Sequence, residues 1–261
     1  MTKTIVRQER TGAVAVLTIN RPETQNALNS AVLEALEEAF AGCEQNSEVR
    51  AIVLTGAGDK AFVAGGDIAD LDSRRGLAHY IEYAELIHRV FRRIEASDKP
   101  TLAAINGWAL GGGFELMLTT DLRLASDTAR LGLPEINLGL FPGAGGSQRA
   151  LRELSPCQAR RLMFLGEPID AAEALSLGLI NEVVPAAQLV PRALELATQL
   201  ASKSPLVLKL LKRTLRDGGQ MTLPAALTYE QAMIGLVLDT EDAHEGCRAF
   251  LDKRPASFKG A

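Results

Sequence analysis

The sequence predicts an α/β fold in which one α/β core is followed by a helical C-terminal extension. Short apolar runs at residues 13–19, 51–55 and 101–105 end in polar residues or glycine, as buried strands do. Apolar residues at helical spacing lie between these runs, and helical patterns dominate after residue 150. Strands that alternate with helices in this way are typical of α/β proteins.

Each of the first two predicted strands leads into a helix. The chain from residue 28 to residue 40 carries the first helical pattern, and residues 80–91 carry the second. A fourth strand is expected at residues 122–125. The residues at helical spacing are Leu28, Val32, Leu36, Ala39 and Phe40 in the first pattern, and Tyr80, Ala84, Ile87 and Phe91 in the second.

Capping residues mark the helices of the last third. Ser155 precedes Pro156, a pair suited to the cap and the first turn of a helix. The sequence from Asp170 to Glu173 resembles a capping box, and Gly178 is placed to end that helix. No low-complexity linker precedes these helices. Further helical patterns cover residues 186–202, 205–217, 222–238 and 241–252.

The composition is that of an ordinary globular protein. The chain has 261 residues, 47% of them hydrophobic, and a net charge of −4, so nothing indicates a nucleic-acid partner. One short basic cluster occurs on a predicted helix, and we interpret it as a solvated helix face. Its residues are Lys209, Lys212, Arg213 and Arg216.

Cysteine usage and the N-terminus indicate the cytoplasm. Cys43, Cys157 and Cys247 show neither a disulfide pattern nor the spacing of metal ligands, which fits a reducing compartment. The start, MTKTIVRQER, has no apolar stretch after its charges, so no secretory signal is expected. No apolar run approaches the roughly 18 residues of a membrane-spanning helix. We therefore expect a cytoplasmic protein without a membrane partner.

Three glycine-rich segments carry the functional signal. Glycines between a strand and a helix let the backbone approach a ligand closely, and amides at a helix start are free to donate to it. Gly111, Gly112 and Gly113 precede an expected helix at residues 114–118, whose positive dipole end would face a developing negative charge. The three segments are residues 62–67, 106–115 and 132–149.

Several other functional motifs are absent from the sequence. No G-x-G-x-x-G follows the first strand, and no glycine precedes Lys-Ser or Lys-Thr, which argues against a dinucleotide or Walker-type phosphate site. There is no G-x-S-x-G elbow for a nucleophilic serine. We expect His79, His88 and His244 at the surface, because they lie in charged helical contexts without metal-ligand spacing. Tight turns without a ligand stay an alternative for any single glycine-rich segment.

Two glutamates lie within the glycine-rich segments. Glu115 falls in the first turn of its expected helix, where an acidic residue can simply complement the helix dipole. Glu135 lies in the almost entirely apolar stretch LGLPEINLGL. Burying a carboxylate there is costly and would raise its pKa toward neutrality. A glutamate in that condition can serve as a general acid or base near pH 7.

Taken together, these residues resemble the crotonase superfamily, also called the enoyl-CoA hydratase/isomerase family. The resemblance runs almost end to end along the chain. Its motifs are Leu17-Thr-Ile-Asn-Arg-Pro22, Asn26-Ala-Leu28, Ala64-Gly-Gly-Asp67, Ala109-Leu-Gly-Gly-Gly113, Pro134-Glu135, Pro142-Gly-Ala-Gly-Gly146, Gln148-Arg149 and Thr240-Glu-Asp242.

The resemblance implies a spiral of repeated ββα units over residues 1–200, which holds the acyl-CoA site. It implies that residues 201–261 form a helical oligomerisation region that supports homotrimers or dimers of trimers. The thioester oxygen would accept from the backbone N–H groups of Gly66 and Gly112, Glu115 would activate water and Glu135 would protonate Cα. No metal is expected, and no cofactor besides the substrate's own coenzyme A. Further implied substrate-binding residues are Ala64, Gly65, Asp67, Ile68, Gly111, Pro134 and Gly143.

The leading functional prediction is an enoyl-CoA hydratase, a hydro-lyase that adds water to a 2-enoyl-CoA with syn geometry. Having both glutamates favours hydration, but an isomerase, dehydratase, decarboxylase or hydrolase on another acyl-CoA stays open. A non-catalytic acyl-CoA-binding or RNA-binding protein is the alternative from a different class. One departure from the family is Gly66, where many hydratases carry alanine, so we expect an altered acyl pocket with its floor at residues 68–83. Trp108 is expected to serve in packing.

Overall fold

A central sheet runs through the protein. The computed structural model describes residues 4–261, so the first residues of the predicted 1–200 core lie outside it. The six strands of this sheet are β1 (Val6–Thr11), β2 (Val14–Ile19), β3 (Ala51–Gly56), β5 (Thr101–Ile105), β7 (Leu122–Ser126) and β10 (Glu182–Val184). They lie side by side in this order, and every neighbouring pair is parallel except β1 with β2.

A second, smaller sheet is built from very short strands. These are β4 (Ala61–Val63), β6 (Trp108–Leu110), β8 (Arg130–Gly132) and β9 (Ile169–Asp170), with β9 antiparallel to β8. The chain passes from the central sheet to the small sheet three times, from β3 to β4, from β5 to β6 and from β7 to β8. A helical segment follows each passage, so the repeated ββα units that the sequence predicts are present.

The helical segments after these passages surround the small sheet. After β4 come α2 (Ile68–Ser73), the π-helical segment η2 (His79–Ala84) and α3 (Glu85–Glu95). After β6 comes α4 (Gly112–Met117). After β8 come the 3₁₀ helix η3 (Pro134–Leu138), α5 (Gly146–Glu153) and α6 (Pro156–Leu165). The remaining elements of the core are the 3₁₀ turns η1 (Pro22–Thr24) and η4 (Ala186–Gln188) with α1 (Ser30–Gln45), α7 (Ala171–Ser176) and α8 (Leu189–Ala201).

The predicted caps are confirmed. The Ser155 hydroxyl accepts from Gln158 N at the start of α6, and the Asp170 carboxylate accepts from Glu173 N at the start of α7. Gly178 follows the end of α7 with a φ of +76°, the left-handed conformation that glycine adopts most easily. These side chains satisfy backbone groups that would otherwise lack partners at the helix ends.

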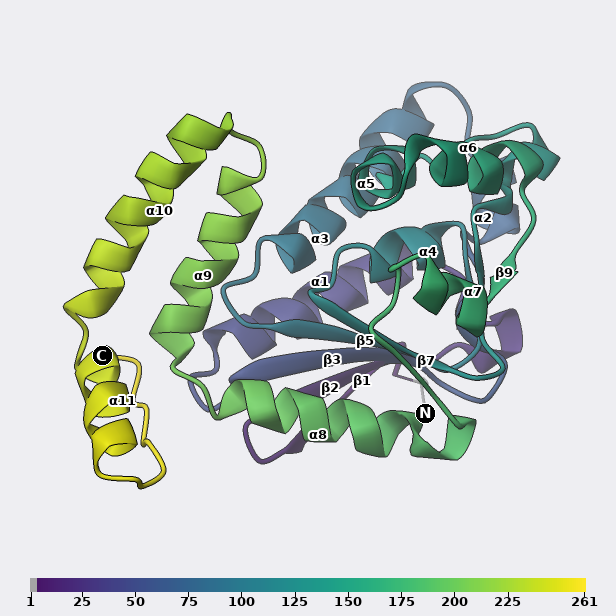
Figure 1. Ribbon diagram of the computed structural model, residues 1–261. Coiled ribbons are helices and arrows are strands. Elements are labelled where there is room, and N and C mark those ends of the chain that lie inside the picture. The colour runs from purple at the N-terminus through teal and green to yellow at the C-terminus, as the bar shows by residue number, and fades with distance from the viewer. Residues whose placement is uncertain (1–3) are drawn as a thin grey trace.

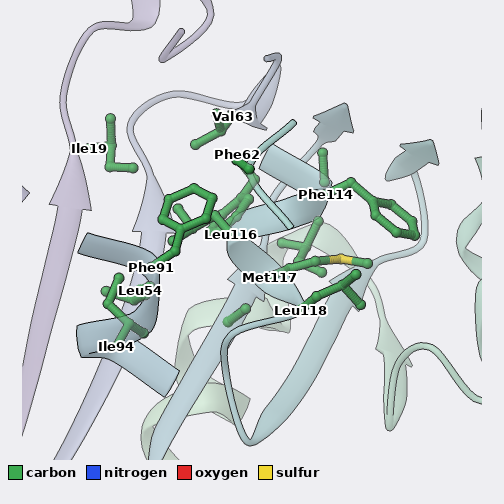
Figure 2. Close-up of a cluster of buried hydrophobic side chains, with 14 of the residues drawn as sticks. Ile19, Leu54, Phe62, Val63, Phe91, Ile94, Phe114, Leu116, Met117 and Leu118 are labelled. Carbon is green, nitrogen blue, oxygen red and sulfur yellow. The ribbon is translucent and has the colours of Figure 1, made fainter. Parts of the chain in front are cut away.

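Both faces of the central sheet are buried, which explains the continuous apolar runs. Along β2, Val14 and Val16 point to the side covered by α8, while Leu17 and Ile19 point to the opposite side. That opposite side is covered by α1, α3 and α4 (Figure 1). Figure 2 shows the resulting core, in which side chains from strands, α3 and α4 lie together. Its labelled residues are Ile19, Leu54, Phe62, Val63, Phe91, Ile94, Phe114, Leu116, Met117 and Leu118.

Three helices complete the chain as a C-terminal arm: α9 (Pro205–Gly218), α10 (Leu223–Leu238) and α11 (Glu241–Leu251). Helix α9 lies next to the core, and α10 and α11 lie beyond it (Figure 1). The basic residues of α9 bind the core: Lys209 and Arg213 both pair with Asp98, at 2.9 Å, and Lys212 pairs with Asp121 at 2.6 Å. The interpretation of this cluster as a solvated face therefore holds only in part, because Lys212 is largely covered whereas Lys209, Arg213 and Arg216 stay 36%, 43% and 39% exposed.

One expectation holds only in part. Trp108 was expected to serve in packing, but 44% of it is exposed in the single chain, so it is only partly packed there. The chain after residue 150 is mostly helical, as predicted, and also contains the short strands β9 and β10. The cysteines agree with their prediction, since all three are free thiols, with Cys43 buried and the others exposed. Within residues 4–261, no helix combines the length and apolarity needed to cross a bilayer.

Candidate active site

Gly66 offers a free backbone N–H. It follows β4, where Leu28 N donates to the Gly65 carbonyl at 2.9 Å and Asp67 N donates to the Leu28 carbonyl at 2.7 Å. In a parallel bridge, the residue between two such bonds directs its own N–H to the opposite side. No acceptor for the Gly66 N–H occurs in the described part of the chain. This amide is therefore available to a ligand.

Gly112 offers a second free N–H at the start of α4. Gly111 precedes it with a φ of +49°, a conformation that favours glycine, and directs the chain into the helix. The Gly112 N–H also lacks an acceptor among residues 4–261. A methyl group added at Gly112 would lie only 3.8 Å from the Gly66 nitrogen. The two amides therefore belong to one site, where a single oxygen could accept from both.

Glu115 is a deeply buried carboxylate on the first turn of α4. Only 3% of the residue is exposed. Its Oε1 accepts from the N–H groups of Ala144 and Gly146, both at 2.7 Å. Burial raises the pKa of Glu115, and the two backbone hydrogen bonds, together with the positive charge of Arg149, act against that rise. Because Oε1 is occupied, Oε2 is the oxygen available to water or substrate.

Glu135 lies in the first turn of η3 and, unlike Glu115, has a buried carboxylate oxygen, Oε2, without a hydrogen-bond donor among the described residues. Burial, with a further contribution from the negative charge of Glu115, raises the pKa of Glu135 to about 7. The carboxyl group lies beside the turn before α4, because a methyl group at Gly111 would be 3.0 Å from Glu135 Oε1. A buried carboxyl oxygen without a partner marks a place for a ligand or a water molecule.

One cavity of about 260 Å³ brings the two glycines and the two glutamates together. Most of its wall is apolar, with a few polar groups, as in small-molecule sites generally. Leu71, His79 and Tyr83, from the segment 68–83 predicted to form the floor of the acyl pocket, line this cavity, and their contact with an acyl group stays a prediction. The other lining residues are Ala84, Ile87, Leu140, Phe141, Gly143 and Ala144.

Gly66 shapes this cavity as well as donating to it. A methyl group at Gly66 would lie 3.0 Å from Leu71 Cδ1 and 3.4 Å from Tyr83 Oη. Glycine therefore leaves space that Leu71 and Tyr83 occupy, in line with the expected change in the acyl pocket. Burial raises the pKa of the Tyr83 phenol, which therefore stays protonated across the physiological range.

Of the remaining predicted substrate-binding residues, one lines the cavity, whereas others are exposed or form contacts within the fold. Gly143 lines the cavity, and Ile68 is 53% exposed beside an adjoining hollow. Asp67 caps α2 and pairs with Arg21 at 3.3 Å, so its carboxylate is engaged in the fold. Backbone hydrogen bonds hold the turn of Ala64 and Gly65 that precedes Asp67. Pro134, whose ring restricts its backbone, is the first residue of η3. Substrate binding by this set stays a prediction: Ala64, Gly65, Asp67, Ile68, Gly111, Pro134 and Gly143.

Sequence reasoning missed several residues of the site. His79 was expected at the surface, but it is half-buried and lines the cavity, because η2 turns it inward beside Leu71. The amides of Ala144 and Gly146 were present in a glycine-rich motif, yet nothing in the sequence paired them with Glu115. Leu140 and Phe141 follow Glu135 closely in the apolar stretch, and that proximity was the available signal.

Comparisons with known proteins agree with this geometry. The family model for enoyl-CoA hydratase/isomerase matches residues 9–261. The chain belongs to this family. It is 42% identical over 246 residues to short-chain-enoyl-CoA hydratase of Clostridium acetobutylicum, with 94% of each chain covered. It is 40% identical to crotonyl-CoA hydratase of Syntrophomonas wolfei subsp. wolfei, with 96% of each covered, and to 2,3-dehydroadipyl-CoA hydratase of Escherichia coli, with 98% of each covered.

Solved structures of the family confirm the predicted crotonase-type fold. A crystal structure of enoyl-CoA hydratase from Bacillus anthracis matches with a TM-score of 0.94 at 36% identity, covering 98% of this chain and 100% of that one. A second match, enoyl-CoA hydratase subunit I of Geobacillus kaustophilus, has a TM-score of 0.93 at 36% identity and covers 98% of both chains. The helical C-terminal region is part of these family matches.

Proposed function

We propose that this protein is an enoyl-CoA hydratase, a hydro-lyase that adds water to a 2-enoyl-CoA and gives a 3-hydroxyacyl-CoA. One observation carries the proposal: a single cavity holds two free backbone amides and two glutamates with raised pKa values. The similarity to relatives named as short-chain-enoyl-CoA and crotonyl-CoA hydratases supports the same reaction.

The backbone amides supply the electrostatic part of the reaction. Addition of water to the β-carbon of an enoyl thioester moves negative charge onto the thioester oxygen. In the proposed complex this oxygen accepts from the N–H groups of Gly66 and Gly112. Loss of one such donor typically lowers the rate about 10²- to 10³-fold. The helix dipole of α4 adds to the stabilisation, because Gly112 stands at its positive end.

The two glutamates supply the proton transfers. Glu115, with Oε1 held by two amides, presents Oε2 to the attacking water and acts as the base. Glu135, with a pKa of about 7, still holds a proton near neutral pH and delivers it to the α-carbon. Both groups line one cavity, which supports the proposal that water and proton add to the same face of the double bond.

The test follows the enoyl absorbance of crotonyl-CoA when purified protein is added. Glu115→Gln and Glu135→Gln should each lower kcat by about 10²- to 10⁴-fold, because a glutamine can neither accept nor deliver the proton. Glu167→Gln is the matched control, since Glu167 is exposed and outside the cavity. If crotonyl-CoA and longer or branched 2-enoyl-CoAs all fail to react with the wild type, the hydratase proposal is wrong.

The assembly is a second part of the proposal: the protein forms homotrimers or dimers of trimers through residues 201–261. The exposed apolar side chains of the C-terminal arm support it. They include Leu211, Leu215, Leu227, Ile234, Leu238, Phe250 and Leu251. The domain boundary at residue 200, the absence of a metal and of any cofactor besides substrate coenzyme A, and the cytoplasmic location stay predictions.

A further inference from the structure

Arg149 connects the loop that binds Glu115 to helix α3. From α5, its Nε and Nη2 donate to the two carboxylate oxygens of Glu95, each at 2.8 Å. Its Nη1 donates to the Ala144 carbonyl at 3.1 Å. The Arg149 side chain is only 14% exposed, whereas the Glu95 side chain is 38% exposed, so the pair is shielded on the arginine side. A paired arginine of this kind is rigid, because both ends of the guanidinium fork are fixed.

The loop that Arg149 holds is the loop that holds Glu115. Ala144 N and Gly146 N donate to Glu115 Oε1, and the Ala144 carbonyl between these two amides accepts from Arg149. The guanidinium also packs against the turn, since a methyl group at Gly145 would lie 2.0 Å from Arg149 Nη1. Gly145 has a φ of +104°, a conformation that favours glycine, and its carbonyl accepts from Arg149 N at 2.8 Å, so the backbone of Arg149 also contacts this turn.

We infer that Arg149, fixed by Glu95, is a positioning residue for catalysis: it holds the Ala144–Gly146 loop so that Glu115 Oε1 stays bound and Oε2 stays directed to water. This inference rests on the hydratase function proposed above. A shift of about 1 Å in a reacting group can lower a rate about 100-fold, so a rigid support for Glu115 affects the chemical step. Arg149 itself does not line the cavity.

The positive charge of Arg149 also supports the role of Glu115 as a base. It lowers the pKa of Glu115 against the effect of burial, which keeps more of the group in the carboxylate form. The other titratable groups that face Glu115 are Glu135 of η3 and Tyr83 and His79 of η2. Removal of Arg149 therefore leaves Glu115 without its nearby positive charge.

The test compares Arg149→Met and Arg149→Lys with the wild type in crotonyl-CoA hydration. Arg149→Met should lower kcat roughly 10- to 100-fold with KM changed less than about threefold, because positioning affects the chemical step more than binding. The acidic limb of its pH profile should move to higher pH. Arg149→Lys should return that limb toward its wild-type position but recover kcat only in part, since lysine lacks the two-sided fork.

Arg89→Met is the matched control. Arg89 makes the same paired contact with Glu37, at 2.9 Å for both bonds, and joins α3 to α1 away from the cavity. The Arg89→Met variant should lower the unfolding temperature while kcat and the pH profile stay at wild-type values. An Arg149→Met protein with wild-type kcat and pH profile per folded molecule would overturn the inference. If Arg149→Met does not fold, Arg149→Lys and Glu95→Gln decide by the same readouts.

Failure of the proposed function can be told apart from failure of this inference. A wild type that hydrates no 2-enoyl-CoA contradicts the function. The pKa of Glu115, measured by ¹³C NMR of labelled glutamate carboxylates in the wild type and in Arg149→Lys and Arg149→Met, still tests the positioning. An unchanged Glu115 pKa and carboxylate signal in Arg149→Met would overturn the inference whatever the activity.

Discussion

Glu115 and Glu135 share a cavity but are held in opposite ways. Glu115 is almost fully buried, with two amides on Oε1 and a nearby arginine. Glu135 is half-buried, and its Oε2 has no partner within residues 4–261. Two carboxyl groups in such different environments are suited to different roles, one as base and one as acid. Burial raises the pKa of Glu135, and the negative charge of Glu115 adds to that rise.

At the residue scale, Glu135→Gln should stabilise the protein at alkaline pH while it removes activity. The folded state keeps the Glu135 proton up to about pH 7, whereas the unfolded chain releases it near the ordinary value of 4.5. Stability from this group is therefore complete below that ordinary value and is lost as pH rises through about 7. Glutamine cannot ionise, so at pH 8 the variant should gain about 1–2 kcal/mol, allowing for solvent screening.

Thermal unfolding at pH 8 and at pH 4 measures this effect. The gain should be present at pH 8 and vanish at pH 4, where the wild-type glutamate is also neutral. A variant no more stable than the wild type at pH 8 would show that the carboxylate carries no burial cost. Glu167→Gln, at an exposed position, should show no pH-dependent gain.

Sequence reasoning singled out Glu135 from its apolar surroundings, whereas the proposed roles of Glu115, Gly66 and Gly112 came from the motifs of the family resemblance and not from local chemistry alone. It did not reach the partners of Glu115. Ala144 and Gly146 lie 29 and 31 positions further along the chain, and only the folded turn directs their amides at Oε1. The inward position of His79 likewise depends on the π-helical turn of η2, which charged neighbours in the sequence conceal.

At the element scale, long apolar strands were predictable and short ones were not. Strands β2, β3, β5 and β7 are continuous buried runs, and their predicted bounds agree with the structure to within one residue. β1 exposes all of its residues but Val6, so it lacks an apolar signal. β4, β6 and β8 have three residues each, too few for any periodicity, and pairing with neighbours creates them.

The junction of α4 with β4 gives a prediction at this scale. Alanine in place of a helical glycine ordinarily stabilises a helix by about 0.5–1 kcal/mol. At Gly113, however, the added methyl group would lie 2.0 Å from the Val63 carbonyl oxygen of β4. Gly113→Ala should therefore push α4 away, lower stability by about 3 kcal/mol and reduce activity, because α4 carries Gly112 and Glu115.

Gly42→Ala is the control for this prediction. Gly42 lies within α1, and nothing stands within 4 Å of an added methyl group. Thermal unfolding should show a small gain for Gly42→Ala and a large loss for Gly113→Ala. Equal effects of the two substitutions would contradict the close approach of α4 to β4.

At the scale of the whole molecule, the C-terminal arm leaves an apolar surface exposed in the single chain. Helix α10 is mostly apolar, with Thr228, Glu230 and Gln231 as its clearly polar residues, and helices of such composition are normally buried in large part. Yet none of its residues is buried in the single chain, nor is any residue of α9. Lys209 and Arg213 of α9 pair with Asp98, and Lys212 pairs with Asp121, so these ion pairs hold the arm against the core. An apolar surface that is held in place in this way fits contact with other copies of the chain.

From this exposed apolar surface we predict an assembly of several chains that one charged substitution on α10 disrupts. Leu227, Ile234 and Leu238 of α10 are exposed by 53%, 49% and 62%, and they recur at helical spacing. The wild type should have a mass three or six times that of the 27.9 kDa chain by light scattering. Ile234→Asp should shift the mass toward one chain and lower the unfolding temperature, because an aspartate cannot be buried there without a partner. Gln8→Glu adds the same charge on the exposed strand β1 and should leave the mass unchanged. A wild type that elutes at the mass of one chain would contradict the assembly.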